Sequence, residues 1–200
     1  MAIDEVLLQT TRSATLRFYR WREASVSFGY FGKIREAEEY AGARAVVRRW
    51  TGGGIVPHGD DLTYSLMIAS ADDAFAFSSR IIYQRIHEVI ASCLQIRGVH
   101  AQLAAAAAPK VSDACFANPV LADVLVANQK IAGAAQRKTR IGLLQQGSIQ
   151  RGDLGEEFRE MMTGALSRNV SQEQIGSSIL QVAQTLVAEK YGSDGWRNRR

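Results

Sequence analysis

The stretch Arg48–Ser65, RRWTGGGIVPHGDDLTYS, is the part of this sequence from which the fold can be argued. Two adjacent arginines lead into three consecutive glycines, Gly52–Gly54. The residues on either side, Val46-Val47 and Leu62–Ala69, are β-branched or apolar for the most part, which predicts two strands. Residues without side chains allow positive φ and a close approach of the backbone to a ligand. The stretch therefore predicts a strand, a glycine loop beside fixed positive charge, and a second strand.

The glycine loop has two interpretations. Its free backbone N–H groups, with Arg48 and Arg49 beside them, suit a carboxylate, a phosphate or a polarised carbonyl. A glycine cluster alone is weak evidence for a site, however, and the loop could be a long hairpin connection with its arginines in solvent. His58 in the same loop could act as a general base, hydrogen-bond a ligand, or do neither.

Length and composition predict one globular domain covering residues 1–200, since 46% of the residues are hydrophobic and 22% charged. The net charge of +4 indicates a mild preference for acidic partners and is too small to indicate nucleic-acid binding. No long apolar run and no basic leader are present, so we expect neither a membrane helix nor a secretory signal. The two cysteines, Cys93 and Cys115, form no disulfide framework, which favours a reduced, cytoplasmic setting.

Hydrophobic periodicity predicts the remaining elements. Helices are expected at 3–11, 34–41, 74–97, 154–166 and 172–191. Gly42 is expected to end the second of them, and a capping box of Ser171 and Gln174 to open the last. Strands are expected at 15–21 and 25–30, paired as a hairpin, and at 99–103 and 141–149. Two more strands, at 123–127 and 130–137, are expected to pair across a turn at Asn128-Gln129. Clustered strands with separate helices and no regular βαβ alternation predict an α+β domain with a mixed sheet.

Three side-chain environments follow from the same patterns. Cys93 lies on the apolar stripe of the 74–97 helix and is expected to be a buried, unreactive residue. His87 lies off that stripe and is expected to be solvated. The arginine-rich end at 197–200 is expected to be a solvated tail.

Cys115 lies in the segment DACFANP, 113–119, which contains turn residues and has no apolar periodicity. A cysteine there is either a packing residue or a nucleophile, and a nucleophile would need a cation or a helix start to lower its thiol pKa. Lys130 is a candidate for that cation, because it opens the strand that follows. No metal site is expected, since the three histidines lack close carboxylate or thiol partners. These features are compatible with acyl transfer.

Several segments, taken in order, resemble the lipoate–protein ligase and lipoyl/octanoyl transferase family. Met1–Leu8 resembles its first helix, and Leu16–Tyr30 resembles its R-F-Y-x-W…S-x-G-Y-F hairpin. Arg48–Ser65 resembles its RR-x-[TS]-GGG-x-V-x-H-x-x-x-[LN]-T-[YF]-S signature, and Lys130–Arg137 resembles its G-x-K-[IV]-[AS]-G-[SA]-A-Q-R segment. The resemblance covers nearly the whole chain and implies the fold of the biotin/lipoate ligase and transferase catalytic domains, a mixed sheet flanked by helices.

Two chemistries occur in that family. Ligases activate free lipoate with ATP and Mg²⁺, usually with an additional C-terminal domain or partner protein. Cysteine-type transferases need no cofactor and move an octanoyl group from acyl carrier protein, through a thioester, to a lysine of a lipoyl-domain protein. Such acceptors are the glycine cleavage H protein and 2-oxoacid dehydrogenase subunits. Ser112–Pro119 resembles the A-C-F-x-x-P segment of the transferases, which implies Cys115 as the nucleophile and Lys130 as the lysine that lowers its pKa. This sequence leaves no room for such an additional domain, so a transferase is expected.

The resemblance also implies an acyl tunnel walled by the glycine loop, His58 and Tyr64, with oxyanion donors near Gly133-Ala134. The substrate-binding residues expected on this basis are Arg48, Arg49, Thr51, Gly52, Gly53, Gly54, His58, Tyr64, Gly133, Ala134 and Gln136.

The sequence departs from the family pattern in two ways. Gln146 stands where relatives often have a histidine, and the strand that usually precedes the first helix is absent, so the start is expected to be truncated or the sheet to lack an edge. An ATP-dependent ligase part and a non-catalytic lipoate- or acyl-binding homologue therefore stay as alternatives.

Overall fold

The computed structural model describes residues 1–109 and 115–199, with the side chain of Cys115 outside that description. The helices are α1 (Ala2–Thr10), α2 (Ile34–Ala41), η1 (Asp73–Ala76), α3 (Ser79–Ile96), η2 (Cys115–Ala117), α4 (Glu156–Leu166), α5 (Ser177–Leu186), η3 (Val187–Tyr191) and α6 (Asp194–Arg197). The strands are β1 (Thr15–Tyr19), β2 (Ser25–Phe28), β3 (Ala45–Arg48), β4 (Val56–His58), β5 (Leu62–Ala69), β6 (Ala101–Leu103), β7 (Val124–Val126), β8 (Gln129–Lys138) and β9 (Gly142–Ile149). The α+β class with flanking helices is confirmed.

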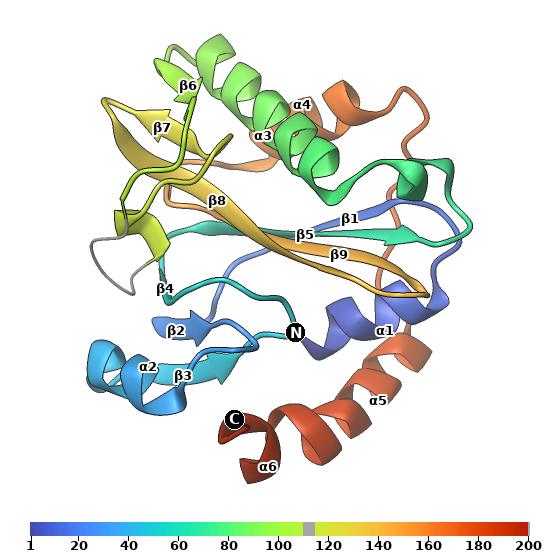
Figure 1. The fold of residues 1–200 in the computed structure, drawn as a ribbon. Coiled ribbons are helices and arrows are strands. Elements are labelled where there is room, and N and C mark those ends of the chain that lie inside the picture. The colour runs from blue at the N-terminus through green and yellow to red at the C-terminus, as the bar shows by residue number, and fades with distance from the viewer. Residues whose placement is uncertain (110–114, 200) are drawn as a thin grey trace.

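A large sheet forms the centre of the molecule, with its strands in the order β1-β5-β9-β8-β7-β6 and every neighbouring pair antiparallel. Strands β5 and β9 are buried along their whole length. Helices α3 and α4 cover one face, and α1 and the small sheet lie on the other side (Figure 1). The main core lies under α3 and α4, where side chains such as Tyr64, Leu66, Ile90 and Phe158 are buried together.

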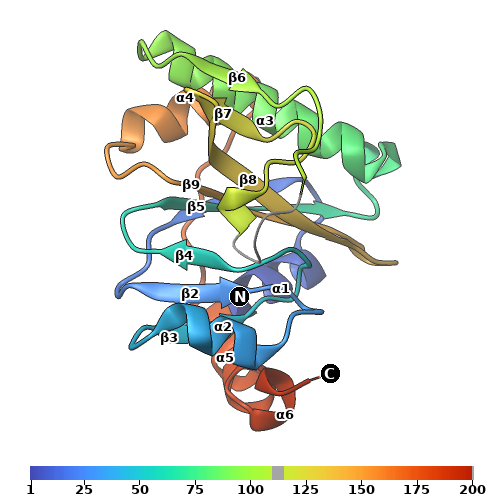
Figure 2. The same ribbon diagram turned by 60° about the vertical axis from the view of Figure 1, so that its left-hand side comes forward.

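The second sheet is small, with the order β3-β2-β4, and it contains the only parallel pair among the described strands, β2 with β3. The expected hairpin of 15–21 with 25–30 is therefore wrong. Strand β1 pairs with β5 and belongs to the large sheet, whereas β2 pairs with β3 and β4. Figure 2 shows β2, β3 and β4 stacked below the large sheet. Periodicity identifies a strand but not its partner, because long-range packing decides the pairing.

Predictions that depend only on residues close together in the chain are confirmed for one hairpin and one helix end. Strands β7 and β8 form the expected hairpin, but its turn lies one residue earlier than expected, at Ala127 and Asn128, whose φ values are 48° and 62°. Two successive left-handed residues are the geometry that a tight hairpin turn requires. The glycine after α2, Gly42, has φ of 61° and ends that helix as expected.

Two helix starts differ from the expectation. The long helix begins at Ser79, not at 74, because Ser78 caps it and Asp72 caps the separate short helix η1. The last helix begins at Ser177, and the capping box of Ser171 and Gln174 is wrong. Residues 171–174 are exposed and have no regular structure, whereas Ala183 of α5 is buried against α1. Most helix stability in proteins comes from such packing and not from the terminal signals.

Within the described residues, no helix is both long and apolar enough to cross a membrane.

Candidate functional site

A pocket with an empty volume of about 420 Å³, part of it open to solvent, lies between the two sheets. Strands β8 and β9 supply one wall, and β2, β4 and the segment after β1 supply the other. The lining residues are Met1, Tyr19, Trp21, Ser27, Arg49, Val56, His58, Thr63, Phe116, Gly133, Ala134, Ala135, Gln146, Gly147 and Ser148. Small residues on β8 and β9 leave the space open, and aromatic rings and buried polar groups surround it.

Arg49 holds the glycine loop from inside. Its guanidinium donates to the carbonyl oxygens of Gly52 and Gly54 at 3.0 and 2.8 Å, and to the Ser27 hydroxyl at 2.7 Å. Gly53 has φ of 85°, and a Cβ there would lie 3.2 Å from the Ala135 side chain. The arginine therefore fixes the loop against β8, and a glycine is needed where the loop approaches that strand.

Arg48 lies away from the pocket although it precedes Arg49 directly. Its side chain stacks on the Phe28 ring and donates to the carbonyl oxygens of Tyr30 and Gly32 on one side. On the other side it donates to the carbonyl oxygens of Arg197 and Arg199. The expectation that 197–200 is only a solvated tail is thus wrong for its described part, because a buried cation needs such acceptors.

Thr51 and Gln146 connect the glycine loop with the first helix. The Thr51 hydroxyl donates to Gln146 Oε1 at 2.9 Å, and Gln146 Nε2 donates to Asp4 Oδ2 at 2.7 Å. Arg17 donates to the other oxygen of Asp4. Burial raises the pKa of Asp4, but the nearby positive charges and these hydrogen bonds outweigh it and hold the pKa below its usual value. Both ends of the Gln146 amide are therefore hydrogen-bonded, which holds this part of the pocket wall in place.

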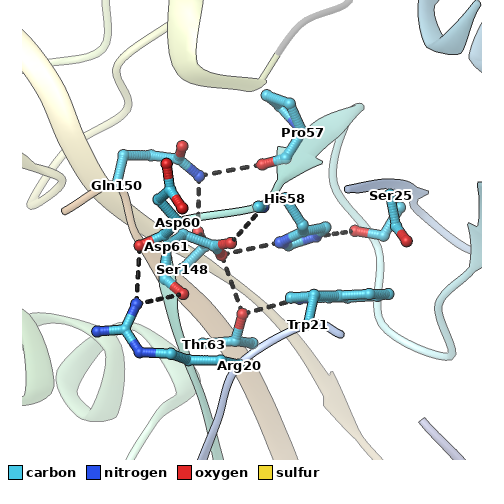
Figure 3. A network of polar contacts seen from close by, with 12 residues as sticks. Arg20, Trp21, Ser25, Pro57, His58, Asp60, Asp61, Thr63, Ser148 and Gln150 are labelled. Carbon is cyan, nitrogen blue, oxygen red and sulfur yellow. Dashed lines mark hydrogen bonds and ion pairs between the residues drawn. The ribbon is translucent and has the colours of Figure 1, made fainter. Parts of the chain in front are cut away.

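His58 belongs to a buried polar network at the pocket (Figure 3). Its Nδ1 donates to Asp61 at 2.8 Å, and its Nε2 accepts from the Ser27 hydroxyl at 2.6 Å. The indole of Trp21 stacks on the imidazole with the ring centres 4.2 Å apart. Burial lowers the pKa of His58 despite the opposing effect of Asp61, so the ring is neutral at neutral pH.

Asp61 is the centre of this network. Its carboxylate accepts from Thr63 at 2.9 Å, from Ser148 at 2.6 Å and from the Gly59 amide at 3.1 Å, in addition to His58. Burial disfavours its charge, but the bonds from His58 and Ser148 outweigh that effect and lower the pKa of Asp61. The network ties β4, β5 and β9 together at one end of the pocket.

Several of the expected substrate-binding residues are not among those that line the pocket: Arg48, Thr51, Gly52, Gly53, Gly54, Tyr64 and Gln136. Tyr64 is fully buried in the core on the helix-covered face, and a Cβ at Gly147 would lie 2.3 Å from its ring. The ring therefore lies against Gly147, a lining residue, without lining the pocket itself, and its role in the tunnel wall stays a prediction. Gln136 donates to Gln145 and to the Ser79 carbonyl oxygen.

Lys130 does not itself line the pocket but lies beside two lining residues, Phe116 and Gly133, a position that we call the rim of the pocket. Its ammonium is 2.8 Å from Asp123 Oδ2 and 5.3 Å from the centre of the Phe116 ring, which lines the pocket. A Cβ at Gly133 would lie 2.4 Å from Lys130 Cε, so the lysine occupies the space that the glycine leaves. The amide of Ala134 donates to the Tyr83 hydroxyl, which removes it from the expected oxyanion donors.

The segment expected to carry the nucleophile lies partly outside the described residues. Cys115 begins η2 directly before Phe116, and its thiol is outside the described part of the chain, as are residues 110–114. Cys93 is buried in the main core as expected, and burial raises the pKa of its thiol. Among the described residues, no three histidine, cysteine or acidic side chains cluster to hold a metal ion.

Sequence reasoning did not single out Trp21, Ser27, Asp61, Tyr83 or Asp123. Asp61 could have been found from its place directly before a predicted strand, in the loop that carries His58. Trp21, Ser27 and Tyr83 could not, because their partners are tens of residues away in the chain, and Asp123 meets Lys130 only across the β7–β8 hairpin.

The chain is similar to known proteins in sequence and in fold. The lipoyl protein ligase A/B catalytic domain family matches residues 1–187. The octanoyltransferase LipM of Oceanobacillus iheyensis is 37% identical over 158 residues, covering 74% of this chain and 58% of the relative. LipM of Bacillus subtilis is 31% identical over 165 residues, covering 74% and 59%. The chain therefore spans about three-fifths of the length of these relatives.

Solved structures share the fold. A lipoate-protein ligase A bound with ATP superposes with a TM-score of 0.77 at 21% identity, covering 98% of this chain and 91% of the other. A bi-partite lipoate protein ligase of Thermoplasma acidophilum, studied with its E2 lipoyl domain, gives 0.71 at 21% identity, covering 98% and 89%. At this identity the likeness concerns the fold.

Proposed function

Since this chain belongs to the lipoyl protein ligase A/B catalytic-domain family, we propose that it transfers an octanoyl or lipoyl group to a lysine of a lipoyl-domain protein. The donor is acyl carrier protein, and the group passes through a thioester on Cys115. Identity of 30–37% to octanoyltransferases supports this choice of chemistry. Because the chain spans only part of those relatives, the activity, the donor and the acceptor are all part of the proposal.

One observation carries the proposal most directly. The Lys130 ammonium is held at the rim of the pocket, beside Phe116, and Phe116 follows Cys115 in the chain. A fixed positive charge near a thiol stabilises the thiolate, which is the form that attacks a thioester. The same charge would stabilise the oxyanion that develops on the acyl carbonyl.

The reaction consists of two acyl transfers. In the first, the Cys115 thiolate attacks the octanoyl thioester, a new C–S bond forms, and the carrier leaves as a thiolate that takes up a proton. In the second, the neutral ε-amine of the acceptor lysine attacks the enzyme thioester. An amide bond forms, the amine loses a proton, and the Cys115 thiolate is released. No oxidant, reductant or cofactor is consumed.

The pocket suits the linear acyl chain. Gly133, Ala134 and Ala135 of β8 present almost no side-chain volume on one wall, and Trp21 provides an aromatic surface on the other. His58 is neutral and its two ring nitrogens are bonded to Asp61 and Ser27, so we assign it to shaping the pocket and not to proton transfer. The partners we propose are acidic proteins, which fits the net charge of +4.

Intact-protein mass spectrometry after mixing with octanoyl-acyl carrier protein tests the proposal. We expect a hydroxylamine-labile octanoyl adduct on the wild type and on Cys93→Ala, the matched control, but not on Cys115→Ala. Addition of a lipoyl domain should then discharge the adduct and give an octanoylated acceptor.

The other outcomes are distinct. An adduct formed only from an octanoylated lipoyl protein would replace the carrier by a second lipoyl domain as the donor. ATP-dependent transfer of free lipoate without an adduct would establish a ligase. Binding of octanoate without turnover in any arm would establish a binding homologue.

A further inference from the structure

The Asp123 carboxylate binds the Lys130 ammonium and two further hydrogen-bond donors. Asp123 is fully buried and accepts from the Lys130 ammonium at 2.8 Å, from the Tyr83 hydroxyl at 2.5 Å and from the Val120 amide at 2.6 Å. A buried carboxylate needs several such donors to stay charged. The position of the Lys130 ammonium thus depends on whether the Asp123 side chain is fixed in place.

The residue before Asp123 has an unusual backbone. Ala122 has φ of 67°, a left-handed conformation that residues with a side chain rarely adopt and that costs free energy. Its carbonyl oxygen lies 2.7 Å from His87 Nδ1, and its amide donates to the Ala104 carbonyl oxygen at 2.8 Å. Because a carbonyl oxygen only accepts, His87 Nδ1 carries the hydrogen. The histidine thus holds the backbone turn that aims Asp123 at Lys130.

His87 is itself the end of a buried chain of hydrogen bonds. Gln136 donates to Gln145 at 2.7 Å, Gln145 donates to the Tyr64 hydroxyl at 2.9 Å, and that hydroxyl lies 3.3 Å from His87 Nε2. Because Nδ1 is the donor, Nε2 accepts a hydrogen bond from the Tyr64 hydroxyl. Each group in the chain therefore donates to the next one, from Gln136 to the Ala122 carbonyl oxygen. His87 is completely buried, and its expected exposure to solvent is therefore wrong. His87 is buried although it lies off the apolar stripe, because its buried partners are polar groups. Hydrophobic periodicity does not detect burial of this kind.

Tyr83 lies one helical turn before His87 on α3, and the two rings pack edge to face 4.1 Å apart. Besides donating to Asp123, the Tyr83 hydroxyl accepts from the Ala134 amide at 3.2 Å. It therefore connects the carboxylate with the strand position next to Gly133, whose missing side chain makes room for Lys130. One rigid helix thereby holds both the carboxylate and the strand.

We propose that Tyr83 and His87 are positioning residues, which fix Asp123 and thereby hold the Lys130 ammonium at the rim of the acyl pocket. The assignment to catalysis rests on the proposed transferase function, whereas the effect on Lys130 itself does not. A rigid supporting shell matters because a displacement of about 1 Å in a catalytic group can cost about 100-fold in rate.

The test compares Tyr83→Phe, His87→Leu and His87→Asn. Tyr83→Phe removes one hydroxyl, and His87→Leu removes the donor to Ala122. In His87→Asn the side-chain amide can replace the Nδ1 donor, so this variant should restore what His87→Leu loses. Tyr40→Phe and His100→Asn, at exposed positions, are the matched controls.

The first measurement needs no substrate. The rate of reductive methylation of Lys130 is followed by peptide mass spectrometry, with the exposed Lys33 as internal reference. We expect Lys130 to react about tenfold faster in Tyr83→Phe and His87→Leu, because a hydrogen bond to a charged group contributes at least that factor. His87→Asn and both controls should react like the wild type.

The second measurement is the steady-state rate of octanoyl transfer. For Tyr83→Phe and His87→Leu we expect kcat to fall about 10- to 100-fold with KM nearly unchanged, since neither residue lines the pocket. Unchanged Lys130 labelling in both variants, with native circular dichroism, would overturn the inference. A wild type that transfers no acyl group from any donor would instead refute the proposed function, and the labelling result would still decide the role of Tyr83 and His87.

Discussion

His58 Nδ1 lies 2.8 Å from the carboxylate of Asp61, and both side chains are buried. Neither residue is a free acid or base, because the carboxylate has three further donors and the other imidazole nitrogen is bonded to Ser27. This pair closes one end of the pocket, and the pair of Lys130 with Asp123 lies at its rim. We expect variants of the first pair to change the stability of the fold, and variants of the second pair to change the rate of acyl transfer.

Asp61→Asn should destabilise the fold. An amide cannot accept all four hydrogen bonds, so buried donors lose their partner, at a cost of about 2–4 kcal/mol. The free energy of unfolding from urea titration measures this. Asp60→Asn is the matched control, because Asp60 is exposed and is the adjacent residue. Equal stability of the two variants would contradict the role assigned to Asp61.

His87 should make stability depend on pH. Burial lowers its pKa to about 4 in the folded state, against about 6.5 unfolded, while Asp123 opposes the shift and Lys130 adds to it. The neighbouring hydroxyls of Tyr64 and Tyr83 stay protonated in this range, since burial raises the pKa of both.

Between these two values the unfolded chain binds the proton and the folded one does not. The contribution of His87 is therefore fully present above pH 6.5 and is lost as the pH falls toward 4, by roughly 3 kcal/mol. Urea unfolding at a series of pH values should show a shallower dependence for His87→Asn. His58 contributes with the same sign, so part of the slope should remain. Identical slopes would contradict a neutral buried His87.

Gly133→Ala should disable acyl transfer. The new Cβ would lie 2.4 Å from Lys130 Cε and 2.7 Å from Nζ, and the ammonium cannot move without leaving Asp123. We expect kcat to fall about 100-fold. Gly164→Ala on α4 is the control, because a Cβ there meets nothing within 4 Å and helix propensity favours alanine by about 1 kcal/mol. Wild-type activity of Gly133→Ala would exclude the proposed place of Lys130.

Arg48→Lys should loosen the C-terminal segment. A planar guanidinium reaches the carbonyl oxygens of Tyr30 and Gly32 on one side and those of Arg197 and Arg199 on the other, and a single ammonium cannot. We expect faster amide hydrogen exchange in α6 and a loss of about 1–3 kcal/mol in the free energy of unfolding. Arg35→Lys, at an exposed position on α2, should change neither quantity.

Much of the local structure follows from nearby residues. The helix that ends at Gly42, the hairpin of β7 with β8 and the two long central strands are determined by backbone propensity and alternation. All are confirmed, although the hairpin turn lies one residue earlier than expected. The start of α5 and the separation of β1 from β2 were not predictable, because each depends on a surface supplied by a distant segment. The resemblance to the lipoate ligase and transferase family, also read from the sequence, is confirmed.

The site divides in the same way. The sequence determined that a glycine loop, His58, Cys115 and Lys130 occur in this order, since residue types and spacing are written in the chain. Only the tertiary structure decided that Arg49 holds the loop while Arg48 holds the C-terminal segment, and that Tyr83 and His87 stand behind Asp123. Apart from the short-range bonds of Arg49 to the loop, these assignments depend on hydrogen bonds between groups tens of residues apart. A buried polar group is satisfied by whichever partner the packing brings near, and no local pattern records that partner.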